Sequence, residues 1–169
     1  MSKSKFTLLS VIIFLISACS DYKTYHQFYS ISEGSWSKTD SLVYEIQNIP
    51  EHAALQVEVR FTSEYPYSDL YLAIRESLSD STYYKVDTLK LSLTHSDGRS
   101  KGSTLGKLYQ TSKSYKTINR PQKAKSNQIY IYHLMNDSAL VGIEDVGIRI
   151  THADDAHDLH PNEEKQTEE

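Results

Sequence analysis

The stretch LQVEVRF, residues Leu55 to Phe61, alternates strictly between apolar and polar side chains. A β-strand turns successive side chains to opposite faces, so four apolar side chains share one face here and three polar ones share the other. An amphipathic helix would instead repeat its apolar residues every three to four positions. The stretch therefore predicts a strand with one face in a core and the other toward water.

The same two-residue period recurs along most of the chain. It is found in LVYEIQNI (42–49), LYLAIR (70–75), LKLSL (89–93), IYIYHLM (129–135) and VGIRI (146–150). Turn-forming residues separate these segments at 49–50, 63–66, 96–98 and 136–137. No long segment carries a helical apolar stripe. Short strands spaced by turns predict an all-β fold, an antiparallel β-sandwich in a single domain.

The middle of the chain, residues 98–125, is polar and rich in lysine and glycine. Its pattern leaves two alternatives open. It is a long loop, of the kind that is more often functional than idle, or two weak strands joined by loops. The glycines of GSTLG (102–106) only loosely resemble a nucleophile elbow, because the central residue is Thr104.

The N-terminus has the order of a lipoprotein export signal. Lys3 and Lys5 precede the apolar run FTLLSVIIFLIS (6–17), which is shorter than the ~20 residues of a membrane span. Small residues then lead to Cys19, the only cysteine of the chain. The order Ile16 to Cys19 looks like a bacterial lipobox, which predicts removal of residues 1–18 and lipidation of Cys19. The alternative is an ordinary cleavage site followed by an accidental cysteine.

The charges are distributed unevenly along the chain. Residues 19–40 are expected to form the lipidated N-terminus and a tether, 41–151 the β-sandwich domain, and 152–169 a disordered acidic tail. The formal charge is −4 overall, the tail alone carries −6, and residues 19–151 hold 15 basic and 15 acidic side chains. A neutral body lacks the clustered positive charge of a nucleic-acid surface, so we expect no nucleic-acid partner.

Sequence motifs for catalysis are missing from the chain. It has no phosphate-binding loop, no dinucleotide fingerprint and no zinc-protease motif, and we expect no enzyme activity and no cofactor. His133 falls on the apolar side of its segment and is interpreted as a core histidine. Histidines and aspartates between His152 and His160 could hold a divalent metal only loosely, so no metal site is predicted.

Tyrosine is abundant, with 13 residues. Tyrosine combines a large contact area with a polar tip, which suits protein or glycan surfaces. The equally weighted alternative is that tyrosine merely favours strands. The candidate binding residues are Tyr65, Tyr67, Tyr71, Tyr109, Tyr130 and Tyr132.

Several segments together resemble one known family. They are ISAC (16–19), EGSWSKTD (33–40), SEYPYSDLYLAI (63–74), DTLKLSL (87–93), SDGRSKG (96–102), GKLYQ (106–110) and ALVGIEDVGIRI (139–150). In this order they resemble the gliding-motility lipoprotein GldH family of Bacteroidota, over nearly the whole body. The blocks around 65–72 and 142–150 carry most of this resemblance.

The resemblance implies a non-enzymatic envelope lipoprotein of the gliding machinery, linked to type IX secretion, whose partners are the membrane and envelope proteins of that machinery. No acidic run follows Cys19, which favours the periplasmic side of the outer membrane over the cell surface. The O-glycosylation pattern of the phylum occurs at Ser41, Ser81, Thr88 and Ser138. The alternative function is a surface or periplasmic carbohydrate-binding lipoprotein.

Overall fold

The computed structural model of the chain describes residues 25–47, 49–78, 84–119 and 126–153. The predicted signal peptide (1–18), Cys19, Ser81 and the tail from residue 154 lie outside these ranges. Among the described residues, no helix is long and apolar enough to cross a membrane.

The described residues contain eleven strands, which form three antiparallel sheets, and one short 3-10 helix. The five-stranded sheet has the order β1 (Tyr25–Ser30), β11 (Ile143–His152), β4 (His52–Phe61), β8 (Leu108–Asn119) and β7 (Ser103–Leu105). The four-stranded sheet has the order β3 (Leu42–Gln47), β9 (Ser126–His133), β5 (Asp69–Leu78) and β6 (Tyr84–Ser92). The helix η1 (Ser32–Gly34) leads into β2 (Ser35–Ser37), which pairs with β10 (Ala139–Val141).

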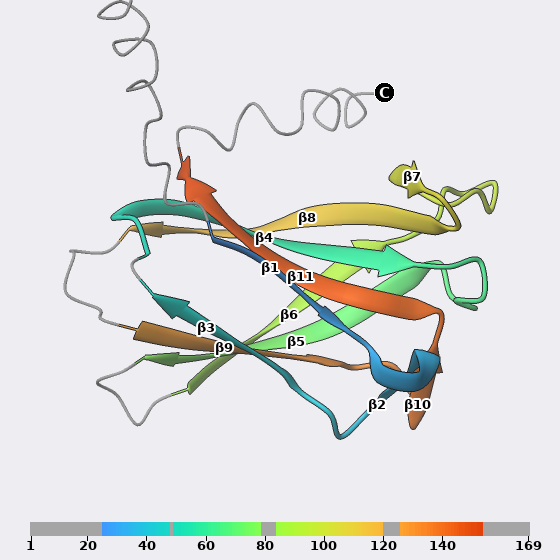
Figure 1. The fold of residues 1–169 in the computed structure, drawn as a ribbon, viewed down its shortest axis with the longest axis horizontal. Coiled ribbons are helices and arrows are strands. Elements are labelled where there is room, and N and C mark those ends of the chain that lie inside the picture. Colours follow the sequence, from blue (N-terminus) through green and yellow to red (C-terminus); the bar gives the residue numbers. More distant parts are fainter. Residues whose placement is uncertain (1–24, 48, 79–83, 120–125, 154–169) are drawn as a thin grey trace, which may run out of the picture.

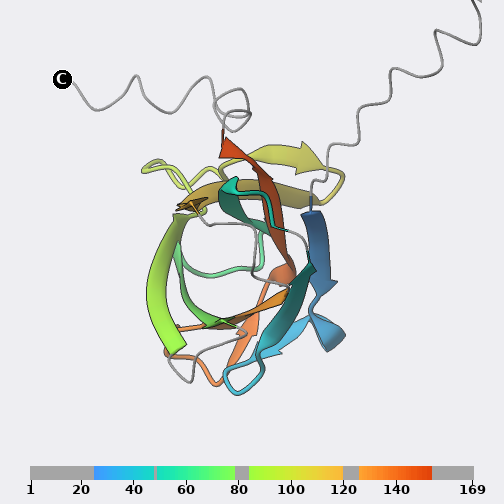
Figure 2. The same ribbon diagram turned by 90° about the vertical axis from the view of Figure 1, so that its left-hand side faces the viewer.

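The two large sheets pack face to face, so the antiparallel β-sandwich predicted from the alternating segments is confirmed. Figure 1 shows the five-stranded sheet above the four-stranded one, with the β2–β10 pair at the right-hand end. At the edges of the sandwich, β1 lies against β3 and β6 lies against β8. The view in Figure 2 shows the strands arranged around one interior.

The core consists of the apolar sides of the alternating strands. Leu55, Val57, Val59 and Phe61 from β4 are all buried, as the opening pattern predicts. The largest buried side chain, Trp36 of β2, closes one end of the core. Its indole Nε1–H donates a hydrogen bond of 3.1 Å to the carbonyl oxygen of Asp40.

The predicted tether boundary at residue 40 is wrong, because folded strands begin at Tyr25. β1 pairs with β11 over six residues, from Tyr25 opposite Ile150 to Ser30 opposite Asp145. Its segment, YHQFYS, has aromatic side chains on both faces and therefore no polar–apolar alternation to reveal it. The two-strand alternative for the middle of the chain is the one observed, since β7 and the long β8 occupy 103–119.

Gly142 joins β10 to β11 where the two blocks of the family resemblance meet. Its φ angle of +82° lies in the left-handed region, and an added Cβ would lie 2.3 Å from the backbone nitrogen of Tyr65. The carbonyl oxygen of Gly142 accepts a hydrogen bond of 2.9 Å from the backbone N–H of Thr62. Glycine is therefore required here both by conformation and by the close approach of the 62–65 turn.

Candidate functional site

Three of the six candidate tyrosines meet on the outer face of the four-stranded sheet. Tyr132 of β9 lies opposite Ala73 of β5. Two residues along the strands, on the same face, Tyr130 lies opposite Arg75. The backbone N–H of Leu134 donates to the carbonyl of Tyr71 over 2.8 Å, which continues this row of neighbours beyond β9. We call this surface the tyrosine face and define it by Tyr71, Val86, Tyr130, Tyr132 and Leu134.

The tyrosine face is apolar and partly open to solvent. Tyr71 is 39 % exposed, Leu134 41 % and Val86 52 %, whereas Tyr130 and Tyr132 are half-buried. Ala73 lies between these side chains and is buried, because the larger side chains around it cover it. Exposed apolar side chains gathered on one sheet face, with charged neighbours, are typical of a contact surface.

Two cations lie against the rings of the tyrosine face. The Arg75 guanidinium carbon is 4.2 Å from the centroid of the Tyr130 ring, and the Lys90 Nζ is 5.7 Å from that of Tyr71. Lys90 also pairs with the Asp69 carboxylate at 3.0 Å. A hydrogen bond from the Ser92 hydroxyl, followed by one from Lys90, lowers the pKa of Asp69. Lys90 is therefore held in position beside the Tyr71 ring.

The other three candidate tyrosines lie elsewhere. Tyr65 is buried, and its hydroxyl donates to the Asp69 carbonyl over 2.8 Å. Tyr67 is exposed in the turn before β5 and donates to the Asp137 carboxylate over 2.6 Å, a hydrogen bond that raises the Tyr67 pKa. Tyr109 is half-buried on β8, with its ring 5.6 Å from that of Phe61. The sequence alone does not distinguish these three tyrosines from the three on the tyrosine face, because the distinction depends on how the strands pair.

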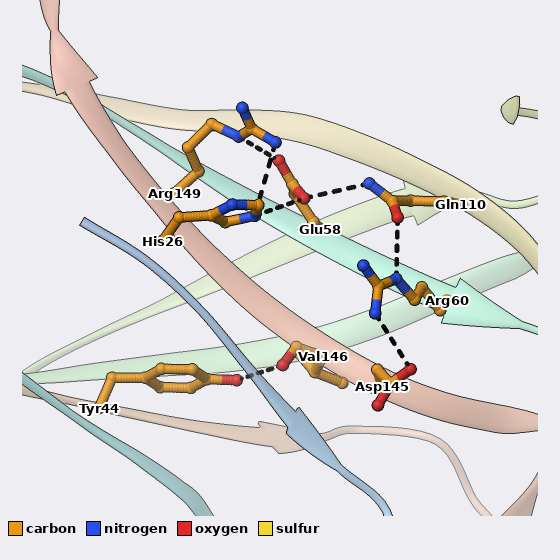
Figure 3. A network of polar contacts seen from close by, with 8 residues as sticks. All are labelled: His26, Tyr44, Glu58, Arg60, Gln110, Asp145, Val146 and Arg149. Carbon is orange, nitrogen blue, oxygen red and sulfur yellow. Dashed lines mark hydrogen bonds and ion pairs between the residues drawn. The ribbon is translucent and has the colours of Figure 1, made fainter. Parts of the chain in front are cut away.

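The outer face of the five-stranded sheet carries a polar network centred on Glu58 (Figure 3). The Glu58 side chain is only 3 % exposed, although the alternation predicted it to face water. The Nε–H of Arg149 donates to its carboxylate over 2.5 Å, and the Gln110 amide over 3.2 Å. The His26 Nε2 lies 3.1 Å from the same group. Glu58 is thus buried by its own partners, which come from three other strands of the sheet, β11, β8 and β1.

A second carboxylate continues this network toward the edge strand. Asp145 pairs with Arg60 at 3.6 Å and accepts a hydrogen bond of 2.6 Å from the Ser30 hydroxyl. The Arg60 guanidinium lies 3.8 Å from the centroid of the Phe28 ring. That ring covers Gly147, where an added Cβ would lie 2.7 Å from it. Acids and cations are matched here, so the network fastens β1 to the sheet and offers no unpaired charge to a ligand.

His133 is a core histidine, in agreement with its sequence pattern. It is 1 % exposed, and its Nε2–H donates to the Trp36 carbonyl over 3.2 Å. Its Nδ1 has no hydrogen-bond partner. Burial lowers the pKa of this imidazole, which keeps it neutral. Within the described ranges, no group of three or more histidine, cysteine or acidic side chains could hold a metal ion.

Three predicted modification sites can be located in the fold. Ser41, Thr88 and Ser138 are exposed, and Thr88 lies opposite Ala73 at the margin of the tyrosine face. Ser81 and the lipidation residue Cys19 fall outside the described residues.

A family model for the GldH lipoprotein matches residues 23–150, which is most of the chain and all of its large sheets except the last two residues of β11. The chain belongs to the GldH lipoprotein family. Membership of this lipoprotein family implies a chain anchored to a membrane by lipid. No curated protein matches the sequence significantly.

Solved structures resemble the GldH-family fold only loosely. The Eiger TNF of S. frugiperda is 7 % identical, with a TM-score of 0.37 over 88 % of this chain and 98 % of that one. The Desmodium yellow mottle tymovirus is 10 % identical, with a TM-score of 0.34 over 79 % of this chain and 88 % of that one. These scores are too low to carry an argument about function.

The sequence interpretation missed two members of the tyrosine face and the whole of the network around Glu58. Leu134 and Val86 join the tyrosines only because β9 and β6 flank β5. His26 and Phe28 were assigned to a tether, and Arg149 lay in a predicted strand without a predicted role. One signal was available in the sequence. Glu58 and Arg60 are polar members of the alternating segment LQVEVRF, and Arg149 is the polar member of VGIRI, so all three were expected on an outer sheet face.

Proposed function

We propose that this GldH-family chain is a non-enzymatic binding or scaffolding component of the gliding machinery, linked to type IX secretion. The observation that carries the proposal is the family match over residues 23–150. The described side chains are consistent with it. Buried polar groups such as Glu58 and Tyr44 are engaged in hydrogen bonds within the fold. Three of the six exposed large apolar side chains of the described residues lie together on the tyrosine face.

The anchor is proposed to be a lipid on Cys19. Acyl burial contributes about 0.8 kcal/mol per CH₂, and two chains are enough for stable attachment to a membrane. We place the anchor in the periplasmic leaflet of the outer membrane, because Ser20 to Lys23 contain no acidic run. Attachment confines the domain to the membrane and raises its effective concentration near other membrane proteins.

The contact surface is proposed to be the tyrosine face. Tyrosine and arginine are enriched among the residues that dominate binding energies in protein interfaces. The face combines Tyr71, Tyr130 and Tyr132 with Arg75, and aliphatic Leu134 and Val86 complete it. An apolar centre with polar neighbours such as Thr88 and Lys90 resembles the core and rim of such interfaces.

The alternative function is a carbohydrate-binding lipoprotein, favoured by three tyrosines on one sheet. Sugars stack on open, flat aromatic faces. The Arg75 guanidinium already lies over the Tyr130 ring, and two of the three rings are half-buried. The geometry therefore favours a protein partner over a glycan.

Affinity purification of the tagged, full-length protein from native membranes in mild detergent tests the proposal. Gliding or type IX secretion components recovered in a fixed ratio support it, and a clean monomer contradicts it. The double variant Tyr71→Ala/Leu134→Ala should lose these components. Leu105→Ala, which removes a 54 % exposed apolar side chain from β7, is the matched control and should keep them. Binding of the wild type to a glycan array, lost in the double variant, would establish the alternative.

Attachment of O-glycans at Ser41, Ser81, Thr88 and Ser138 is a separate proposal. Intact-mass measurement of the native protein should show added mass that falls stepwise in Ser→Ala and Thr→Val variants. An unmodified mass would contradict it.

A further inference from the structure

The sandwich has two distinct ends. At one end β1 and β4 begin and β8 and β11 finish, with Tyr25, Leu55 and Ile150 in one row. We call this the β1-start end; it faces the viewer in Figure 2. The opposite end, here called the β10 end, holds the β2–β10 pair and the 62–68 turn, at the right of Figure 1.

The chain between the anchor and β1 is short. Cys19 precedes Tyr25 by six residues, and an extended chain spans at most ~3.3–3.6 Å per residue, so Tyr25 lies within about 20 Å of the anchored residue. Along β4, the step from Leu55, level with Tyr25, to Phe61 covers about 20 Å at ~3.3 Å per residue. The β2–β10 pair extends still further from Tyr25. A molecule with its β10 end on the membrane would need a longer tether than the sequence supplies.

The side chains of the two ends differ in the same sense. At the β1-start end the exposed described residues are polar, among them Glu51, His52, Asn119 and His152, which suits contact with hydrated lipid headgroups. Apart from Val86, the exposed large apolar side chains of the described residues lie in the half nearer the β10 end. They are Tyr67, Tyr71, Leu105, Leu134 and Val141.

We propose that the sandwich stands on the lipid bilayer on its β1-start end, with its strands steeply inclined to the membrane and its β10 end pointing away. This inference rests on the proposed lipidation of Cys19. In this orientation the tyrosine face is presented sideways, parallel to the membrane normal. It then meets a protein that stands on the same membrane beside it, rather than the lipid itself.

The test measures the height of two labels above the bilayer. The lipidated full-length protein is reconstituted into vesicles of phosphatidylethanolamine and phosphatidylglycerol that carry an acceptor dye on their headgroups. Acylation occupies the Cys19 thiol, so a cysteine introduced as Glu51→Cys or Ser96→Cys is the only free thiol to label. Both positions are exposed. Glu51 precedes β4 at the β1-start end, and Ser96 follows β6 at the other, about 30 Å away for a ten-residue strand at ~3.3 Å per residue.

Energy transfer to the lipid acceptor should be several-fold more efficient from residue 51 than from residue 96. Equal transfer from the two labels would mean that the molecule lies flat, and stronger transfer from residue 96 would mean that it is inverted; either result overturns the proposal. Inserting 15 glycine and serine residues between Asp21 and Tyr22 should lower transfer from residue 51. Unchanged transfer in that variant would show that the tether does not set the orientation.

A separate measurement distinguishes failure of the anchor from failure of the orientation. Protein that does not float with the vesicles in a density gradient overturns the lipidation on which the inference rests. Protein that floats but gives equal transfer overturns the orientation alone and leaves the envelope role standing.

Discussion

Replacing Arg149 by methionine should destabilise the fold, mainly because it leaves the buried Glu58 carboxylate without its cationic partner. Methionine keeps the aliphatic part of the side chain on the sheet and removes the guanidinium that donates to Glu58 over 2.5 Å. The Glu58 side chain is 3 % exposed, so its carboxylate cannot recover that hydrogen bond from bulk water. It keeps only the contacts with His26 and Gln110.

The magnitude follows from the burial of the two partners. Removing one member of a fully buried ion pair costs about 3–5 kcal/mol. Arg149 is 29 % exposed, and Glu58 keeps two partners, so we expect about 2 kcal/mol for Arg149→Met. Glu58→Met should cost about 1 kcal/mol, because Arg149 can turn toward water. The double variant leaves no orphaned charge and should lie within about 1 kcal/mol of the wild type.

Urea unfolding measures these free energies, with Trp36 as the probe. It is the only tryptophan of the chain and is 1 % exposed, so its fluorescence reports the loss of the core. The double variant should be more stable than Arg149→Met alone, with a coupling energy of about 2 kcal/mol between the two positions. Additive effects within about 0.5 kcal/mol would refute the argument that the Glu58 network is a cooperative buried unit.

Three further predictions test other parts of the fold. Gly142→Ala should cost about 3 kcal/mol in urea unfolding, because strain at positive φ adds to overpacking against the Tyr65 backbone; Gly98→Ala, also at positive φ but with nothing within 4 Å, is the control and should cost only about 1 kcal/mol. Since burial lowers the His133 pKa below the ordinary 6.5, the unfolded chain binds more protons below that pH, and stability should fall as the pH drops below about 6.5. His133→Gln should flatten this acid limb of the stability curve; an unchanged slope would contradict the assignment. Tyr115→Phe removes the hydroxyl that donates to Asp87 over 2.7 Å and should cost about 1 kcal/mol, and an unaltered unfolding midpoint would show that this bond between β8 and β6 does not contribute.

The fold class could be predicted because core strands such as β4 have a strictly two-sided environment. The segment 55–61 alternates in sequence because one face meets the core, and the structure buries those side chains. β1 could not be recognised in the same way. Each of its sides carries two aromatic side chains, Tyr25 and Tyr29 on the inner one and His26 and Phe28 on the outer one, since both faces of this edge strand pack against neighbours.

The sequence indicated tyrosine as the type of residue to expect in a binding surface, but not which tyrosines lie together. Tyr71, Tyr130 and Tyr132 share the outer face because β5 and β9 are neighbours in the sheet although about 60 residues separate them in sequence. Tyr65 and Tyr109 look the same in the sequence as the three tyrosines of the outer face, but their positions in the fold direct them inward. Strand order, which a single sequence does not reveal, decides which tyrosines meet.

The fastening of β1 has a mechanical consequence. In an anchored molecule, any pull between the membrane and a bound partner enters the fold at Tyr25 and passes along β1. The antiparallel pairing with β11 over six residues means that a pull along the strand loads all of its hydrogen bonds together rather than one after another. The Ser30–Asp145 bond and the Phe28 ring over Gly147 add resistance to sliding. β1 is thus the strand through which force enters the domain. The force needed to separate β1 from β11 would set the largest load that the protein could carry.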